Sequence, residues 1–532
     1  MNQIDLLIKD AKIVDGSGAT AYKGSLAAHD GDIKAIFRGD QELFLAKNQV
    51  EKVVDGDGYV LAPGFIDVHT HSDLNILVSG MAESKLQQGV TTEIIGNCGS
   101  SPAPIKEAGR SMLKDELADY GMELDWSSYP EFLEKLSNID KSINVASLIG
   151  HGAIRKAVAG FVDRELTLPE IDEAKDILAE AMEAGSIGFS SGLIYPPSSY
   201  GTTEELIELA KVAASYGGIY TTHLRDEGCG MISAVKEAIA IGRQSGIPVH
   251  ISHHKVVDKE CWGLVSGTLE MMESARKEGI DITCELYPYL ATSTSLSSLL
   301  PDWAHEGGRN KLLKRLEAGE DREKILDYLN EKVARRGWEN VMISELPGGR
   351  YPEFEGATLK ELGESWQMAE ADALLKILKE QELRAGMIGF AMCESDLESV
   401  LTSRLSMIGS DGSSLAVEGM LARGKPHPRN FGTFPRILGR YVREKGLIDL
   451  ETAVHKMTGK SAARFGFNDR GLLKTGLKAD LVLFDESKII DRAEFIEPFH
   501  YPDGIKEVWV AGKSVLQDGK ISERRPGKLL KI

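Results

Sequence analysis

Histidine, cysteine and aspartate residues recur where short apolar runs of this sequence end. Imidazole nitrogens, thiolate sulfur and carboxylate oxygens are the atoms with which proteins bind zinc. Any one such residue is most simply explained as structural, but such residues follow at least five separate runs. This repetition predicts a single metal-dependent active site. The residues concerned are His69, His71, Cys98, His151, His223, His253, His254 and Asp411.

The pair His69 and His71 closes the apolar run GFIDVHTH. Alternate residues of a strand point to the same face of a sheet. Both imidazoles, and Asp67 before them, are therefore expected to face one cavity. The pair ends a predicted strand that follows a predicted β-domain, which makes it a candidate for metal binding.

Cys98, His223 and His253 end three other runs, in the segments TTEIIGNC, YTTHLRDE and HISHHK. Three protein ligands leave a fourth position for water, which is the composition of catalytic zinc sites, whereas structural sites are closed by four ligands. The ligand within HISHHK is ambiguous, because His250 lies on the same run and His254 must face the opposite way from His253. We choose His253.

Asp411 ends the last predicted strand, in IGSDGS. Asp-Gly is a common turn signal. Beside a metal cluster, the carboxylate is also suited to accept a proton from attacking water and to return it to a leaving amine. We therefore expect Asp411 to be the catalytic acid and base. Cys229, Cys261, Cys284 and Cys393 lack a comparable setting and are expected to be structural.

These residues require a scaffold that brings the ends of distant strands together. Strand-like runs alternate with helical ones through the middle of the chain, which is typical of a (β/α)8 TIM barrel, an α/β fold. Catalytic groups of such barrels lie at the carboxyl ends of the strands. The eight predicted strands cover about residues 65–71, 91–98, 144–151, 186–191, 219–225, 248–254, 281–287 and 406–411.

The two ends of the chain have a different pattern, in which short apolar bursts are punctuated by Gly and Asp. This pattern predicts short strands joined by turns. We expect residues 1–62 and 466–532 to form one small β-sandwich domain, with the barrel in residues 63–465. The stretch at about 290–400 is too long for one barrel connection and is predicted to be an inserted helical subdomain.

Composition narrows the class of protein. The chain has 532 residues, 42% hydrophobic and 27% charged, which is typical of a soluble globular protein. Its net charge of -19 argues against binding to nucleic acid or to anionic membranes. The five widely spaced cysteines argue against a disulfide scaffold and favour a reducing compartment. Neither a signal peptide nor a long apolar run is evident, so we expect a cytoplasmic protein. The sequence indicates no particular oligomeric state.

The motifs as a set resemble those of the D-aminoacylase (N-acyl-D-amino-acid deacylase) family of the amidohydrolase superfamily. The resemblance spans nearly the whole chain, including the divided β-domain. The segments that carry it are GFIDVHTHSD, GVTTEIIGNCGSSPAP, SSGLIYPPSSYGTTEEL, YTTHLRDEG, HISHHK, IGSDGS and KPHPRNFGTFPRIL.

This resemblance implies that Cys98, His223 and His253 bind a tightly held zinc ion. It implies a second, weaker metal position at His69 and His71, with Cys98 and Asp411 nearby. Many relatives in the superfamily bridge two metals with a carboxylated lysine on the fourth strand. That strand here reads SIGFSSGL and has no lysine, which counts against the hydantoinase and dihydroorotase branches.

The resemblance also implies a site for the carboxylate of the substrate. Lys255, Tyr287 and Arg423 fall at matching positions, and Lys255 shares a strand face with His253. Arginine offers a fork of donors to a carboxylate and lysine a point charge. Ser293 and His427 are further candidates of the same kind.

The function implied is zinc-dependent hydrolysis of N-acyl-D-amino acids, which are small molecules, to a carboxylic acid and a free D-amino acid. The preference for the D form comes from the resemblance alone. A D-dipeptidase and a cyclic-amide hydrolase are alternatives within the superfamily, and the missing lysine disfavours the second. A scaffold protein without catalysis is the alternative from another class, and the presence of every expected ligand type argues against it.

Overall fold

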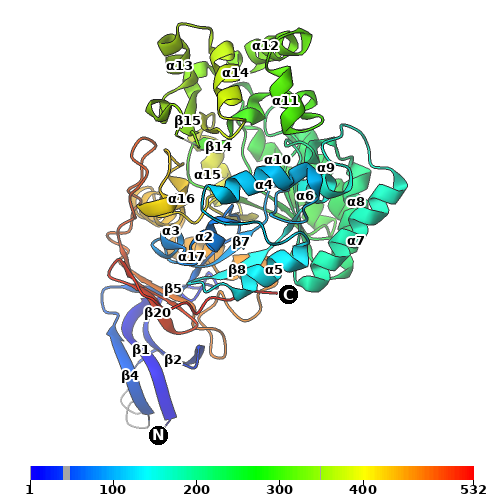
Figure 1. Ribbon diagram of the computed structural model, residues 1–532. Coiled ribbons are helices and arrows are strands. Elements are labelled where there is room, and N and C mark those ends of the chain that lie inside the picture. The colour runs from blue at the N-terminus through cyan, green and yellow to red at the C-terminus, as the bar shows by residue number, and fades with distance from the viewer. Residues whose placement is uncertain (1, 40–47, 348, 532) are drawn as a thin grey trace.

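Strands from the two end segments of the chain lie together in one β-domain, below the larger body formed by the middle of the chain (Figure 1). The computed structural model describes residues 2–39, 48–347 and 349–531. Residues 1, 40–47 and 532 of the expected β-domain and residue 348 of the expected insertion lie outside the described residues. The protein has mixed α/β structure.

The β-domain is built from strands of both chain ends. The order across the sheet is β21-β20-β19-β18-β5-β1-β2-β3, and β4 pairs with β1. A sandwich has two sheets, whereas these hydrogen bonds connect all nine strands into one. The strands are β1 (Asn2–Ile13), β2 (Tyr22–His29), β3 (Asp32–Phe37), β4 (Asn48–Asp55), β5 (Val60–Pro63), β18 (Leu481–Phe484), β19 (Ile505–Val510), β20 (Lys513–Gln517) and β21 (Lys520–Ile521).

Two-residue turns ending in glycine set the register of three hairpins in this domain. Residues Asp30 and Gly31 have φ angles of 51° and 78°, and Asp518 and Gly519 have 51° and 75°. The turn between β19 and β20 has the same form. Turns with positive φ at both central residues match the twist of the adjoining strands, and Asp-Gly is a favoured pair for them. The glycine-punctuated pattern at the chain ends therefore has a direct structural cause.

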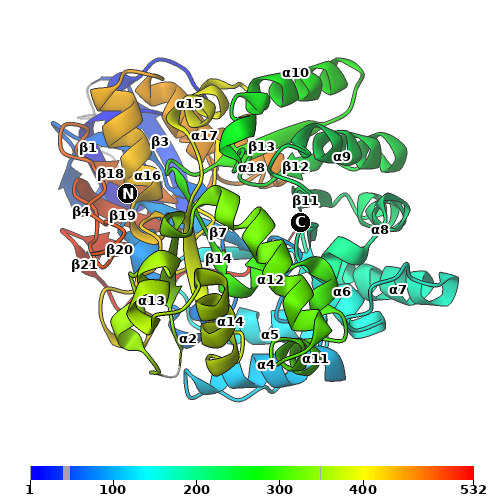
Figure 2. The same ribbon diagram turned by 90° about the horizontal axis from the view of Figure 1, so that it is seen from above.

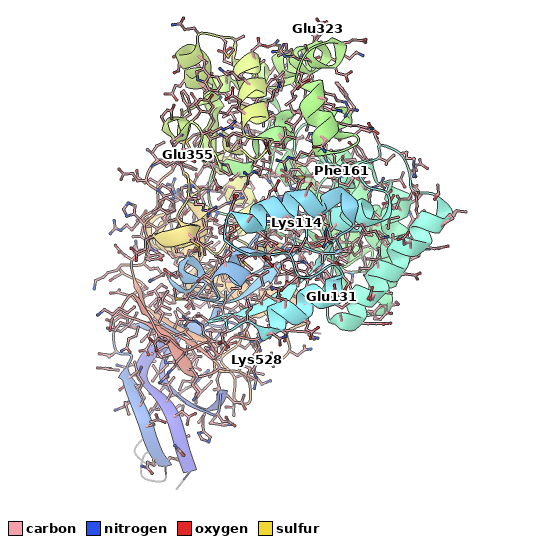
Figure 3. The ribbon with its side chains drawn as sticks, viewed as in Figure 1. Lys114, Glu131, Phe161, Glu323, Glu355 and Lys528 are labelled. Carbon is pink, nitrogen blue, oxygen red and sulfur yellow. A yellow bond between two sulfur atoms is a disulfide. The ribbon has the colours of Figure 1, made fainter. Side chains whose placement is uncertain are left out.

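The C-terminal tail ties the β-domain to the body of the protein. After β21 the chain runs beside Val145, whose backbone N–H donates to the carbonyl oxygen of Lys528 at 2.9 Å. The N–H of Leu530 donates back to Val145 at 2.7 Å. Lys528 lies at the lower side of the body (Figure 3).

The strands of the body pair in parallel. One set has the order β6-β7-β8 and the other the order β17-β13-β12-β11-β10-β9. The backbone of Leu148 donates to Ile95 at 3.0 Å, and a parallel bridge joins Thr70 to Gly412. These strands are β6 (Phe65–Asp67), β7 (Val90–Ile95), β8 (Asn144–Ser147), β9 (Ile149–Gly150), β10 (Gly188–Gly192), β11 (Ile219–His223), β12 (Val249–Ile251), β13 (Ile282–Leu286) and β17 (Ser406–Ile408).

Helices lie between successive parallel strands, and Figure 2 shows α6 to α10 side by side along one side of the body. In α7, Glu170 accepts a hydrogen bond from the backbone N–H of Thr167, and Gly185 ends the helix with a φ of 114°. Its apolar stripe includes the buried Ala174 and Leu178. These helices are α5 (Tyr129–Asn138), α6 (His151–Val158), α7 (Leu168–Ala184), α8 (Thr203–Ser215), α9 (Met231–Ser245) and α10 (Leu264–Lys277).

The long segment after β13 forms a separate layer at the top of Figure 1. It has its own core, which includes Leu329, Ile343 and Leu374. Besides the expected helices it contains an antiparallel sheet of order β14-β16-β15, which the sequence pattern did not predict because the strands are short and β14 is largely polar. The elements are β14 (Ala291–Ser295), α11 (Arg309–Arg315), α12 (Glu320–Lys332), β15 (Val341–Glu345), α13 (Leu359–Trp366), α14 (Glu370–Glu380) and β16 (Gly386–Phe390).

Contacts near Phe161 and α4 hold this layer on the body. The carbonyl oxygen of Phe161, labelled in Figure 3, accepts from the N–H of Gly307 at 2.6 Å. Arg384 pairs with Asp119 at 2.7 Å. The remaining helices are α2 (Asn75–Val78), α3 (Glu83–Leu86), α4 (Glu107–Ala118), α15 (Glu394–Thr402), α16 (Arg429–Arg436), the π-helix η9 (Ile437–Glu444), α17 (Leu450–Met457) and α18 (Gly459–Arg464). Among the described residues, no helix combines the length and apolarity needed to cross a bilayer.

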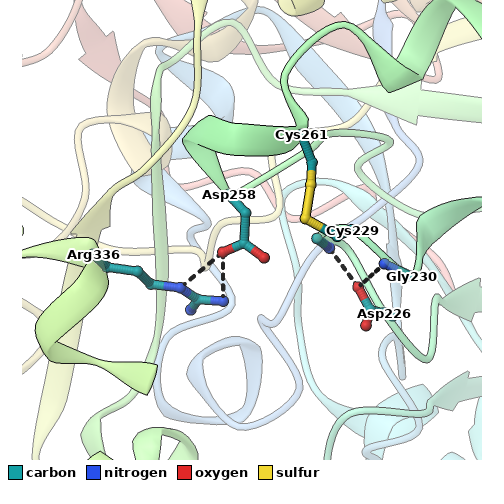
Figure 4. The surroundings of a disulfide bond; sticks show 7 residues. Asp226, Cys229, Gly230, Asp258, Cys261 and Arg336 are labelled. Carbon is teal, nitrogen blue, oxygen red and sulfur yellow. Dashed lines mark hydrogen bonds and ion pairs between the residues drawn. A yellow bond between two sulfur atoms is a disulfide. The ribbon is translucent and has the colours of Figure 1, made fainter. Parts of the chain in front are cut away.

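A disulfide joins Cys229, in the loop after β11, to Cys261, in the loop after β12 (Figure 4). A structural role was expected for both residues, but their pairing was not, because the number and spacing of the cysteines argued against a disulfide scaffold. Their separation of 32 residues gave no spacing motif, because the pairing depends on two loops that meet at neighbouring strand ends. Cys98, Cys284 and Cys393 are free.

Candidate metal and catalytic site

One buried sulfur lies among three imidazoles at the carboxyl ends of the parallel strands. The Sγ of Cys98 is 3.3 Å from Nε2 of His69, 3.4 Å from Nε2 of His253 and 3.7 Å from Nδ1 of His223. Each residue ends a different strand or lies within three residues of its end, the strands being β6, β7, β11 and β12. The strand ends thus bring together side chains that are far apart in the sequence, from His69 to His253.

Asp411 follows β17 and joins the same cluster. Its Oδ1 is 3.0 Å from Nε2 of His71 and 3.4 Å from Nε2 of His69. Its Oδ2 is 2.7 Å from Nη1 of Arg429, at the start of α16. The backbone N–H of Asp411 donates to the carbonyl oxygen of His69 at 2.8 Å, so the segment after the last parallel strand is joined to the segment after the first.

Three residues of the cluster have a left-handed backbone. The φ angles are 52° at Cys98, 33° at His253 and 51° at Asp411. Such values are uncommon for residues other than glycine, cost free energy, and concentrate at active sites. Gly192 of β10 packs so tightly here that a Cβ would lie 2.1 Å from the carbonyl oxygen of Cys98. The backbone at these three residues is therefore locally destabilising, and it directs the three side chains into the cluster.

Two carboxylates that the sequence analysis missed lie behind the imidazoles. Glu285 of β13 is 2.7 Å from Nδ1 of His69, accepts from the backbone N–H of His253 at 2.7 Å, and contacts His250. Glu227, in the loop after β11, contacts His253 and His223. Glu285 is a charged residue inside the otherwise largely apolar run ITCEL, and this unusual position could have indicated a role in the site.

The electrostatics of the cluster favour a cation at its centre. Burial raises the pKa of a thiol, yet the neighbouring His69 and His253 hold the pKa of Cys98 well below its usual value. Burial lowers the pKa of an imidazole, yet Glu227 and Cys98 raise the pKa of His223 to about 9. Burial likewise opposes ionisation of Asp411, but Arg429 and the histidines hold its pKa well below its usual range. The buried anions thus require positive charge between them.

The donor set fits a zinc ion. Ligand atoms of His69, Cys98, His253 and Asp411 all lie within 4.8 Å of one another. A thiolate together with imidazoles and a carboxylate is a typical set for zinc. The other histidines of the site region face elsewhere, since Nε2 of His254 lies 2.9 Å from Thr268 Oγ1. His250 contacts Thr283 and Glu285, and His151 contacts Ser198 and Glu205.

Comparison with known proteins shows the family to which this chain belongs. A profile described as "Amidohydrolase family" matches residues 52–345 and 396–516. The D-aminoacylase of Alcaligenes xylosoxydans xylosoxydans is 36% identical over 526 residues, which cover 99% of this chain and 97% of that protein. The chain belongs to the D-aminoacylase family of the amidohydrolases. It is 34% identical to the N-acyl-D-glutamate deacylase of the same organism, with 99% and 97% covered.

Solved structures of this family share the fold. The N-acyl-D-glutamate deacylase of Bordetella bronchiseptica, complexed with zinc and a phosphonate that mimics the tetrahedral intermediate, matches with a TM-score of 0.83 and 33% identity over 100% of both chains. A crystal structure of D-aminoacylase matches with a TM-score of 0.82 and 33% identity, covering 99% of this chain and 100% of the other. The protein is thus an enzyme of the amidohydrolase class with the fold of the D-aminoacylases.

The residues expected to bind the substrate carboxylate are only partly brought together. The Nζ of Lys255 and the Cζ of Arg429 lie 5.8 and 4.7 Å from the ring centroid of Tyr287. The carbonyl oxygen of Ser293 accepts from Nη2 of Arg429 at 3.2 Å. Arg423 instead donates to the carbonyl oxygen of Asp119 and stacks on Tyr120.

Arg429 was missed, although it lies within the quoted motif KPHPRNFGTFPRIL. Its contact with Asp411 depends on where the start of α16 lies relative to the loop after β17, which the sequence does not state. His427, two residues earlier, donates from Nε2 to the carbonyl oxygen of Ala291 at 3.0 Å, and its Nδ1 accepts from the N–H of Arg429. His427 therefore orients the start of α16.

We expect Arg429→Lys to lower kcat/KM for the amide substrate on the order of 100-fold, because one ammonium cannot donate to both Asp411 and Ser293 in the geometry of the guanidinium. Steady-state kinetics check this. Arg436→Lys is the matched control, since Arg436 lies on the same helix, pairs with Asp491 at 2.9 Å and stacks on Tyr289. If Arg429→Lys keeps wild-type kcat/KM while Arg423→Lys loses about 100-fold, Arg423 alone is the arginine that the reaction requires.

Proposed function

We propose that this enzyme hydrolyses the amide bond of N-acyl-D-amino acids, giving a carboxylic acid and a free D-amino acid. The observation that carries the proposal is the buried set of Cys98, His69, His223 and His253 beside the ionised Asp411, in a chain 34–36% identical along its length to D-aminoacylase and N-acyl-D-amino-acid deacylases. The preference for the D form rests on what those relatives are named for.

We further propose that the parallel strands close into a (β/α)8 barrel within residues 63–465, with the segment at about 290–400 as an inserted subdomain. The pairing of Thr70 with Gly412 supports closure, because it joins the first strand to the last. A barrel accounts for the site, since its strand ends all meet at one mouth.

The proposed cofactor is zinc, with one ion held tightly by Cys98, His223 and His253. A second, weaker position is proposed at His69 and His71, with Cys98 and Asp411. When bound, zinc supplies polarisation of the scissile carbonyl and acidification of a water molecule. One solved relative is described as having a binuclear centre, in which one metal activates and the second attenuates.

Asp411 is the proposed proton carrier. Arg429, His69 and His71 surround its carboxylate and keep it ionised, so it is ready to accept a proton from the attacking water. Once protonated, it donates that proton to the leaving amine nitrogen as the amide bond breaks. The proposed binding group for the substrate carboxylate remains Lys255, Tyr287, Arg423 and Ser293. Arg429 is added to it, because its guanidinium stacks on Tyr287 and donates to the carbonyl oxygen of Ser293.

The structure offers no lysine on β10 to support hydrolysis of cyclic amides. β10 (Gly188–Gly192) reads GFSSG and offers no lysine to be carboxylated. D-hydantoinase matches with a TM-score of 0.54 at 16% identity, which is a likeness of fold alone.

Hydrolysis of a panel of substrates by the zinc-supplied enzyme tests the function. We expect release of free D-amino acids from N-acetyl-D-amino acids and at least about 100-fold lower kcat/KM for the L forms, because the carboxylate and the scissile carbonyl must engage the site together. A D-dipeptide and a hydantoin serve as comparison substrates. Faster cleavage of either one than of every N-acetyl-D-amino acid would replace the proposed activity by that alternative.

Asp411→Asn should leave the tightly held zinc in place and lower kcat by about 10³-fold or more, because the amide cannot accept the proton of the attacking water. Metal analysis and steady-state kinetics on the same preparation separate the two effects. Turnover within tenfold of wild type at equal zinc content would remove Asp411 from proton transfer.

A further inference from the structure

Glu227 is a buried carboxylate to which neither the sequence motifs nor the proton transfer assigns a role. It is 8% exposed and lies in the loop between β11 and α9. Its Oε1 is 3.0 Å from Nδ1 of His253, and its Oε2 is 3.4 Å from Nε2 of His223. One carboxylate therefore contacts two of the proposed zinc ligands, with a different oxygen for each.

The contacts define which nitrogen of each ring faces inward. His253 turns Nε2 toward Cys98, and His223 turns Nδ1 toward it. An imidazole nitrogen binds a metal only when it carries no proton, so the proton of the neutral ring must be on the opposite nitrogen. In both rings that opposite nitrogen is the one facing Glu227.

We propose that Glu227 is a positioning residue that accepts the outward N–H of both His223 and His253, and so fixes their tautomers and ring orientations for zinc. The inference rests on the proposed ligand set. In this arrangement the two histidines proposed to bind the tightly held zinc share one carboxylate, Glu227, whereas His69 contacts a different one, Glu285.

Lys255 completes this arrangement from the other side. Its Nζ donates to Oε1 of Glu227 at 2.7 Å and to the carbonyl oxygen of His253 at 3.1 Å. The ammonium thus balances the buried charge of Glu227 without removing it as an acceptor. Its Nζ also lies 2.8 Å from Nδ1 of His253, so both nitrogens face Oε1 of Glu227, and with His253 bound to zinc through Nε2 both would donate to that oxygen.

The loop that carries Glu227 is fixed at several points. The carbonyl oxygen of Glu227 accepts from the N–H of Val257 at 2.9 Å, and this hydrogen bond links the Glu227 loop to the loop after β12. The disulfide of Cys229 begins two residues later, and Asp226 accepts from the N–H groups of Gly228 and Gly230 (Figure 4). A carboxylate held in this way is suited to orient other groups.

Zinc affinity of Glu227→Gln tests the proposal, measured by competition with a chromogenic chelator on the full-length protein. We expect the Kd for zinc to rise about 10- to 100-fold, because a single amide oxygen cannot accept from both rings. Glu237→Gln is the control, since Glu237 pairs with Arg225 at 2.8 Å on the neighbouring helix and does not contact the cluster. At saturating zinc, kcat of Glu227→Gln should fall more than KM rises.

Zinc affinity within about threefold of wild type in folded Glu227→Gln would overturn the proposal. If that variant does not fold, Glu227→Asp decides instead, because the shorter carboxylate keeps its charge but reaches one ring. The Kd of Glu227→Asp for zinc should rise more than about threefold above that of wild type, and a value within about threefold would overturn the inference. Wild-type enzyme that binds zinc but cleaves no N-acyl-D-amino acid would refute the proposed function and leave this inference standing.

Discussion

The site depends on the burial of one sulfur anion among imidazoles. Cys98, together with Asp411, Glu227 and Glu285, places four acidic groups in a region with almost no access to water. Buried anions are costly unless positive charge compensates them. Arg429 and Lys255 supply part of that charge, and the imidazoles supply the rest only by taking up protons. A divalent cation at Cys98 satisfies the same demand and frees the imidazoles to act as neutral ligands.

The surrounding structure serves to hold that arrangement. Parallel strands bring their carboxyl ends to one edge, and left-handed backbone at Cys98, His253 and Asp411 turns the side chains inward at a cost in local stability. Carboxylates behind the rings then set the direction of each imidazole. Loops after β11 and β12 are joined by the disulfide, so the two segments that carry His223 and His253 are connected covalently next to the site.

The sequence predicted the parts of this site that lie at strand ends. His69, Cys98, His223, His253 and Asp411 each close an apolar run, and the alternation of strands and helices places such positions together. What it could not predict depends on contacts between elements. Glu227 contacts two imidazole rings because the loop after β11 lies beside the segment after β12. Arg429 contacts Asp411 because the start of α16 lies next to the loop after β17.

The features that the sequence did not distinguish or pair have similar causes. Arg423 and Arg429 are six residues apart in one loop-like basic segment, and only the position of α16 distinguishes them. Cys229 and Cys261 gave no spacing signal, because their pairing follows from the adjacency of β11 and β12. The strands β14, β15 and β16 were missed, since each has only five residues and pairs across long intervals.

X-ray absorption at the zinc edge of the zinc-loaded enzyme tests the central claim most directly. The account predicts one sulfur scatterer at about 2.3 Å with nitrogen and oxygen scatterers at about 2.0–2.2 Å, and loss of the sulfur shell in Cys98→Ser. A wild-type spectrum that requires nitrogen and oxygen alone, with the Cys98 thiol still open to alkylation, would contradict it.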